Sequence, residues 1–210
     1  MYPAGNLFIT IPHGRLEAIL KEPGGQPING VSLVLHPHPL GGGTMHNKVV
    51  FRAAAALNDA SMVVLRINFR GVGLSTGEHD EGRGERDDVR AGLDYLVETY
   101  PDEKITLCGF SFGARVGLEV GMTDDRVMQM ISIGTPVDKY DFSFLEQCRK
   151  PILFVQGEHD EYGNIDRLRE LVATINAPTE LKIIGGAGHF FDNQLNELKS
   201  AITDWIGQAL

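Results

Sequence analysis

Hydrophobic residues fall into two patterns that alternate along the chain: short apolar runs and longer stretches with helical spacing. The short runs are typical of strands buried on both faces, and the longer stretches are typical of amphipathic helices. We expect strands at Leu7–Ile11, Leu16–Lys21, Val31–His36, Met62–Asn68, Lys104–Gly109, Val127–Ile133, Pro151–Gln156 and Leu181–Ile184. We expect helices at Asn47–Ala60, Arg86–Tyr100, Ser111–Gly121, Ile165–Ile175 and Gln194–Ile206.

This alternation predicts an α/β fold, a mostly parallel, twisted sheet of eight strands with helices on both faces. We found no repeat and no flexible linker, so we expect a single domain over residues 1–210. In sheets of this kind, ligands bind at the carboxyl ends of the strands. Candidate chemistry is therefore sought in the residues that directly follow each strand.

The chain is acidic, and its charge excludes several classes of partner. It has 28 Asp and Glu against 19 Lys and Arg, a formal net charge of -9. Such a surface opposes non-specific binding to nucleic acid or to anionic membranes. Residues 1–10 contain no basic segment ahead of an apolar stretch, so we expect no signal peptide and a cytoplasmic protein. A homodimer is compatible with the sequence.

The two cysteines do not form a disulfide framework in a chain of this length. Cys108 lies within an apolar run, as a small core residue would, and Cys148 is remote from it in sequence. We expect two free thiols.

The segment Gly109-Phe110-Ser111-Phe112-Gly113 has the pattern G-x-S-x-G between an expected strand and an expected helix. A serine on such a sharp turn needs small residues two positions before and after it, because a Cβ there would clash. The helix N-terminus also favours a developing oxyanion. Ser111 is therefore the candidate nucleophile, although a helix N-cap serine has the same local pattern.

A serine hydroxyl needs a base to take its proton and an acid to orient that base. His189 follows the last expected strand and a Gly-rich loop, and Asp160 follows the strand before it. The chain order Ser111, Asp160, His189 is that expected for the G-x-S-x-G architecture. Neutral His189 would act as the base, so activity should fall in acid. Three other acids close to Asp160 in sequence remain alternatives: Glu158, Glu161 and Asp166.

The segment after the strand at Val31–His36 is a Gly-rich loop over residues 36–43. Such a loop can bring a backbone N–H to the oxyanion, and the N–H of Phe112 would be the second donor.

The sequence resembles the α/β-hydrolase superfamily over nearly its whole length. It is most similar to small, cap-less bacterial hydrolases related to dienelactone hydrolase and to small carboxylesterases. The resemblance is carried by HPHPLGGGTMHN (residues 36–47), NFRGVGLSTGEHDEGRGERDD (68–88), GFSFGA (109–114), GEHD (157–160) and GGAGH (185–189).

The resemblance implies Ser111, Asp160 and His189 as a catalytic triad. It places the first oxyanion donor in the stretch His38–Leu40, where Pro39 has no N–H. We favour Leu40, followed by His38.

Two further expectations come from comparison with the family. Dienelactone hydrolases use a cysteine nucleophile, so Ser111 favours the hydrolysis of ordinary esters. Arg70 ends a strand at the active-site edge and is expected to pair with an acid at the start of the next helix, such as Asp87. A solvated pair that contributes little is an equal alternative.

The expected function is that of a serine hydrolase that cleaves small carboxylic esters through an acyl-enzyme, without cofactor or metal. Only residues 135–150 separate the strands between which many such hydrolases carry a cap, so we expect an open site. Aromatic residues next to the catalytic positions are expected to line it: Phe112, Tyr162, Phe190 and Phe191.

Other functions remain open on the same sequence. Thioesters and lactones react through the same kind of tetrahedral intermediate, and a non-catalytic binding protein can share the fold. A metallohydrolase would draw its ligands from His36, His38, His46, His79 and Asp80. Two prolines stiffen the first of these segments, which disfavours the convergence that a zinc site needs.

Overall fold

A computed structural model describes residues 5–12, 14–24 and 27–209. The strands are β1 (Leu7–Ile11), β2 (Gly14–Lys21), β3 (Val31–Leu35), β4 (Val63–Ile67), β5 (Ile105–Phe110), β6 (Val127–Ile133), β7 (Ile152–Gly157) and β8 (Thr179–Ile184). They form one sheet in the order β1-β2-β4-β3-β5-β6-β7-β8. The pairings β1–β2 and β2–β4 are antiparallel, and all others are parallel.

The helices are α1 (Lys48–Asp59), α2 (Arg83–Thr99), α3 (Phe112–Gly121), α4 (Ile165–Thr174) and α5 (Leu195–Ala209). Two short 3-10 turns, η1 (Pro39–Gly41) and η2 (Ser143–Gln147), lie in loops. Every expected helix and strand is present, and the eight-stranded, mostly parallel α/β architecture is confirmed.

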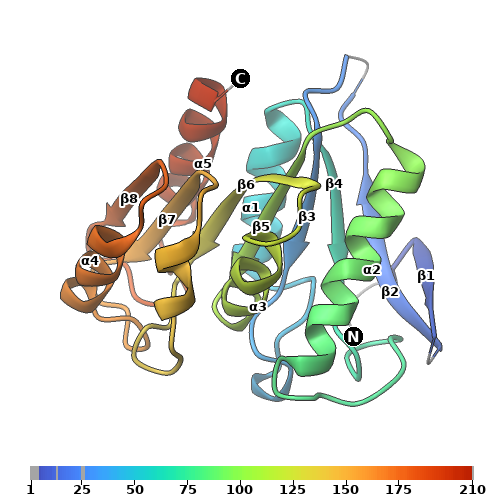
Figure 1. Cartoon of the computed structure of the whole chain (residues 1–210), viewed down its shortest axis with the longest axis horizontal. Coiled ribbons are helices and arrows are strands. Elements are labelled where there is room, and N and C mark those ends of the chain that lie inside the picture. Colours follow the sequence, from blue (N-terminus) through green and yellow to red (C-terminus); the bar gives the residue numbers. More distant parts are fainter. Residues whose placement is uncertain (1–4, 13, 25–26, 210) are drawn as a thin grey trace.

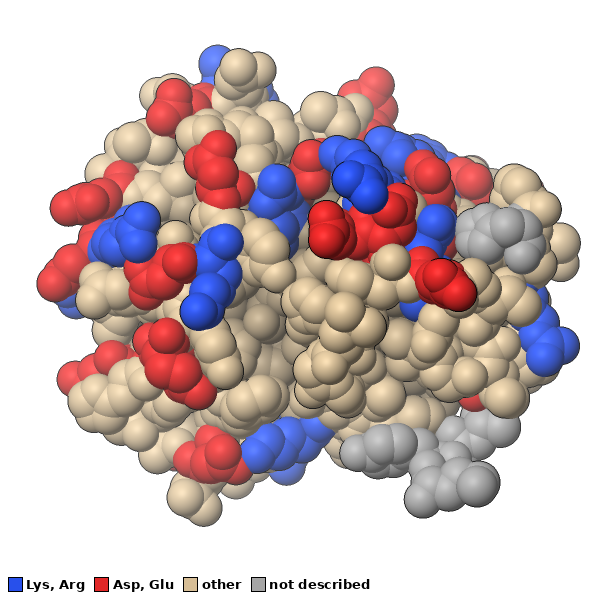
Figure 2. Space-filling view, turned by 90° about the horizontal axis from the view of Figure 1, so that it is seen from below, with Lys and Arg blue, Asp and Glu red and all other residues tan. Residues whose placement is uncertain are grey.

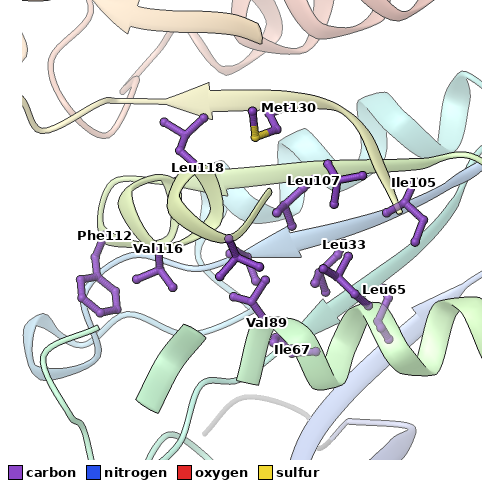
Figure 3. Packing of buried hydrophobic residues seen from close by; sticks show 14 of the residues in the cluster. Leu33, Leu65, Ile67, Val89, Ile105, Leu107, Phe112, Val116, Leu118 and Met130 are labelled. Carbon is purple, nitrogen blue, oxygen red and sulfur yellow. The ribbon is translucent and has the colours of Figure 1, made fainter. Parts of the chain in front are cut away.

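Helices cover both faces of the sheet, and each face has its own hydrophobic cluster (Figure 1). Alternate residues of one strand enter different clusters: Leu33 packs under α2 and α3, whereas Val34 packs under α1 and α5. Figure 3 shows the first cluster, in which Val89 of α2 and Val116 of α3 meet the strand residues Leu33 and Leu107. This two-sided burial holds the central strands rigid and fixes the positions of the loops at their ends.

The carboxyl ends of the parallel strands lie at the lower edge of the molecule in Figure 1. The loops after β3, β5, β6, β7 and β8 therefore gather there, and Figure 2 is seen from that side. Cys108 and Cys148 are buried free thiols, as expected. None of the helices in the described part of the chain is long and apolar enough to cross a membrane. Residues 1–4 of the segment examined for a signal peptide lie outside the described residues.

Candidate active site

Ser111 lies on a strained turn between β5 and α3, with φ 56° and ψ -117°. The turn is tight enough that a Cβ on Gly109 would lie 2.4 Å from the carbonyl oxygen of Gly113. A Cβ on Gly113 would lie 2.5 Å from the carbonyl oxygen of His36 on the neighbouring strand. These contacts account for both glycines of the G-x-S-x-G pattern, and the strain lifts the serine hydroxyl out of the sheet edge.

His189, in the loop after β8, reaches Ser111 directly. Its Nε2 atom lies 2.9 Å from the Ser111 Oγ atom, within hydrogen-bond distance. Three aromatic rings enclose the imidazole, with ring centroids 4.9 Å (Phe110), 4.7 Å (Tyr162) and 5.2 Å (Phe190) away. This packing limits the ring to few orientations, so that Nε2 faces the serine.

Asp160, after β7, holds the other nitrogen of the imidazole. The Nδ1–H of His189 donates to Asp160 Oδ2 at 2.8 Å, and the carboxylate is buried. Asp160 Oδ1 also accepts the backbone N–H of Tyr162 at 2.9 Å. The alternatives lie elsewhere: Glu158 and Glu161 accept backbone N–H groups of the His189 loop, and Asp166 is exposed on α4 beside Arg169.

Gln156 is a site residue that the sequence reasoning missed. Its side-chain amide is wholly buried at the end of β7. The amide Nε2 donates to Asp160 Oδ2 at 2.9 Å and to the carbonyl of Gly163 at 3.0 Å, while Oε1 accepts the N–H of Thr135 at 2.7 Å. Gln156 thus fixes the acid to the loop after β6. The available signal was a lone amide at the end of the apolar run PILFVQ.

His36 plays a comparable part on the other side of Ser111. The imidazole is completely buried after β3, where Nε2 accepts the N–H of Phe69 at 3.0 Å and Nδ1–H donates to the carbonyl of Pro37 at 2.6 Å. Burial lowers the pKa of His36 to about 4, so the ring is neutral near pH 7. It anchors the loop that carries His38.

The geometry disfavours Leu40 as the first oxyanion donor and favours His38, the other expected donor. The N–H of Leu40 donates to His38 Nδ1 at 3.2 Å in the turn η1, and its side chain is 78% exposed. His38 lines the pocket beside Ser111, and Leu40 does not. Among the described residues, the backbone N–H groups of His38 and Phe112 have no acceptor. These two are therefore the candidate donors.

A pocket of about 450 Å³ opens at Ser111 and His189. The expected aromatic residues Phe112, Tyr162 and Phe190 all contribute to its wall. The expectation for Phe191 is wrong, because its side chain is fully buried in the cluster under α1 and α5. In Figure 2 the centre of this face is mostly uncharged, with acidic and basic side chains around it.

The partner expected for Arg70 is also corrected. Arg70 donates to Asp88, one residue beyond Asp87, with Nη2 2.8 Å from Oδ1 and an additional bond from the Arg70 backbone N–H. The Asp88 side chain is fully buried, whereas Asp87 is exposed and pairs with Arg90. Helical geometry turns Asp88 toward the sheet and Asp87 toward solvent. The pair joins the loop after β4 to α2.

The histidines named for a metal site do not converge with other ligands. Among the described residues there is no group of three or more His, Cys, Asp or Glu arranged to hold a metal ion. His36 is engaged as above, and His79 lies with its Nδ1 2.7 Å from Glu85 Oε1.

Comparisons with known proteins show the family and the fold of this chain. Residues 31–205 match a family model described as "Alpha/beta hydrolase domain". The uncharacterized protein RP471 of Rickettsia prowazekii is 39% identical over 209 residues, which is 95% of this chain and 87% of that protein. A solved alpha-beta serine hydrolase homologue from Coxiella burnetii is 38% identical, with a TM-score of 0.90 and coverage of 97% of this chain and 99% of its own. XC6422 from Xanthomonas campestris, described as a serine hydrolase without lid, is 32% identical, with a TM-score of 0.90 and coverage of 100% and 97%.

Proposed function

The chain belongs to the alpha/beta hydrolase family, and from that premise we propose that it cleaves small carboxylic esters with Ser111 as nucleophile. The observation that carries the proposal is the unbroken chain of hydrogen-bond distances from Asp160 through His189 to Ser111 at the mouth of a pocket. The esterase Pf2001 from Pyrococcus furiosus, at 20% identity and a TM-score of 0.81, shares the fold.

In the proposed reaction, His189 Nε2 takes the proton of Ser111 as Oγ attacks the ester carbonyl carbon. Asp160 holds the imidazole in the tautomer that leaves Nε2 free, and stabilises the imidazolium that forms. The imidazolium then gives its proton to the departing alcohol, which leaves an acyl group on Oγ. Water, deprotonated by His189, attacks this acyl-enzyme and releases the acid.

The negative charge on the carbonyl oxygen during both attacks would be met by the N–H groups of His38 and Phe112. The N–H of Phe112 is the first of α3, where the helix dipole adds to the hydrogen bond. Preorganised donors of this kind contribute roughly 2.7–4 kcal/mol each in enzymes that hydrolyse acyl groups.

Short acyl chains are favoured by the shape of the site. The segment between β6 and β7 contains only the turn η2 and no helical lid in the described structure. A long acyl chain would therefore leave much of its apolar surface in water, which removes the binding energy that burial provides.

Labelling with a fluorophosphonate tests the nucleophile, because only an activated serine reacts with it. The wild type should be labelled and Ser111→Ala should not. An unlabelled wild type would instead favour the non-catalytic binding protein. Para-nitrophenyl acetate should then be cleaved with higher kcat/KM than the palmitate ester, and a preference for palmitate would contradict the open-site argument.

A further inference from the structure

The pocket at Ser111 has an unusual charge for a protein of this composition. Although Asp and Glu outnumber Lys and Arg by 28 to 19, the residues that line the pocket include one lysine, Lys139, and no Asp or Glu. The remaining polar contributors are neutral, among them the phenols of Tyr140 and Tyr162. A substrate group that enters this space therefore meets hydrogen-bond donors and one positive charge, without a negative charge in the wall.

Lys139 is exposed and forms no ion pair with any described residue. Its ammonium lies 5.5 Å from the centroid of the Tyr162 ring, in a cation–π contact. Since Tyr162 itself packs against the imidazole of His189, the ammonium is linked to the candidate nucleophile through two ring contacts and one hydrogen bond.

The acids nearest to Lys139 in sequence are Asp138 and Asp141, and both are engaged with other groups. Asp141 accepts hydrogen bonds from the backbone N–H of Ser143, at 2.9 Å, and from its hydroxyl, at 2.8 Å. Asp138 accepts hydrogen bonds from Arg167, at 2.6 Å, and from the backbone N–H of Asn164, at 2.8 Å. Glu161 accepts the backbone N–H of His189. No described carboxylate therefore forms an ion pair with Lys139, although Lys139 also lines a neighbouring cleft with Asp138 and Asp141. Its ammonium remains available to a ligand in the pocket at Ser111.

The geometry points to esters that carry a carboxylate group away from the scissile bond as the preferred substrates, with Lys139 as the residue that selects them. This inference rests on the proposed esterase function and specifies its substrate class. Tyr140 and Tyr162 also line this pocket, and a phenol hydroxyl can donate to such a carboxylate. A partly exposed ammonium confers a modest preference, roughly threefold to fivefold in kcat/KM.

Matched ester pairs that differ only in charge test the inference. One pair carries the charge on the leaving group: para-acetoxybenzoate and para-acetoxybenzamide. The other carries it on the acyl group: the para-nitrophenyl esters of adipic acid and of adipic acid monoamide. The ratio of kcat/KM, charged over neutral, should be about three to five for at least one pair in the wild type, and should decrease as salt rises.

Three variants assign that ratio to one side chain. Lys139→Met should bring the ratio to about one, and Lys139→Arg should keep it. Lys21→Met is the matched control, because Lys21 is exposed at the opposite end of the sheet, paired in register with Val64, and should keep the wild-type ratio.

The inference is overturned if neither anionic ester is preferred, or if the preference persists in Lys139→Met. Hydrolysis of the neutral esters without an anionic preference would remove this inference and leave the proposed function standing. Failure to cleave any of the four esters, together with no fluorophosphonate labelling, would remove the proposed function itself.

Discussion

On the β7–β8 side of Ser111 the candidate site consists of side chains, whereas on the β3 side it consists of a backbone N–H, that of His38. Asp160 and His189, the proposed acid and base, lie on the first side and would act through the functional groups of their side chains. On the second side any residue other than proline offers the same donor, and what matters is where the loop places it. One side therefore depends on residue identity and the other on loop geometry.

Both sides share a supporting feature, a buried polar side chain that does not itself line the pocket. Gln156 connects Asp160 to the loop after β6. His36 connects the loop after β3 to Phe69, which follows β4. A buried polar group without partners is costly, so each of these residues holds its neighbours in the one arrangement that satisfies it. We therefore expect substitution of Gln156 to lower kcat, and substitution of His36 to change how the free energy of unfolding depends on pH.

The largest expected effect lies on the side-chain side. Asp160→Asn retains the shape of the acid but no longer favours the tautomer of His189 that leaves Nε2 free to accept the Ser111 proton. We expect kcat for para-nitrophenyl acetate to fall by about 10³- to 10⁴-fold. Asp166→Asn, which removes an exposed carboxylate in the same segment, should stay within twofold of the wild type. Comparable losses in both variants would show that Asp160 has no special part.

The next largest effect concerns His36, on the β3 side of the site, and is a change in the free energy of unfolding with pH. The pKa of His36 is about 4 in the folded protein against an ordinary value of 6.5. Between pH 6.5 and pH 4 the His36 imidazole is protonated in the unfolded chain but stays neutral in the folded protein. The stability due to neutral His36 is therefore complete above pH 6.5 and is lost as the pH falls toward 4, by about 3 kcal/mol in all.

Urea unfolding at pH 7.5 and pH 4.5 measures this loss. His36→Gln keeps an acceptor for the Phe69 N–H but does not titrate, so its free energy of unfolding should fall less between the two pH values than that of the wild type. His159→Gln, at an exposed histidine, should behave as the wild type does. Equal losses in wild type and His36→Gln would exclude His36 as the source.

A smaller effect is expected from the support on the side-chain side. Gln156→Leu preserves size but removes the donor to Asp160 and the acceptor for Thr135. We expect kcat to fall roughly 10- to 150-fold with KM little changed, since a hydrogen bond to a charged group contributes about 1.5–3 kcal/mol. Gln129→Leu is the control, because Gln129 bonds Thr106 on the neighbouring strand β5 and contacts no triad residue. An unchanged kcat would show that Asp160 holds its position without the amide.

The same contrast explains how far the sequence alone leads. The apolar runs predicted the central strands β3, β4, β5 and β7 because buried parallel strands are nearly continuous in hydrophobicity. Ser111, Asp160 and His189 could be named as candidates because each follows a strand and carries a recognisable functional group, and the structure brings the three side chains within hydrogen-bond distance. Asp88 was missed in favour of Asp87, since the ends of α2 and hence its inward face cannot be fixed from periodicity to within one residue.

The backbone donor on the β3 side could not be predicted from the sequence in the same way. A backbone N–H has no signature in the sequence, and the choice between His38 and Leu40 depends on a turn of three residues. The His38 imidazole accepts the Leu40 N–H in that turn, beside the backbone bonds from Gly41 and Gly43 to the His38 carbonyl. Gln156 was missed for a related reason: a single amide at a strand end acquires its role only from partners distant in the fold.

The smallest effect tests that turn directly. His38→Ala removes the acceptor for the Leu40 N–H, so the loop should relax and the His38 N–H should lose its alignment, with a fall of about fivefold to tenfold in kcat. His38→Asn should restore most of the loss, because asparagine at this position caps the turn in the same way. Leu40→Ala should be close to the wild type, since the Leu40 side chain is exposed and the N–H is retained. If His38→Ala keeps the kcat of the wild type, as Leu40→Ala should, the His38 imidazole does not align the oxyanion donor and this account of the turn is wrong.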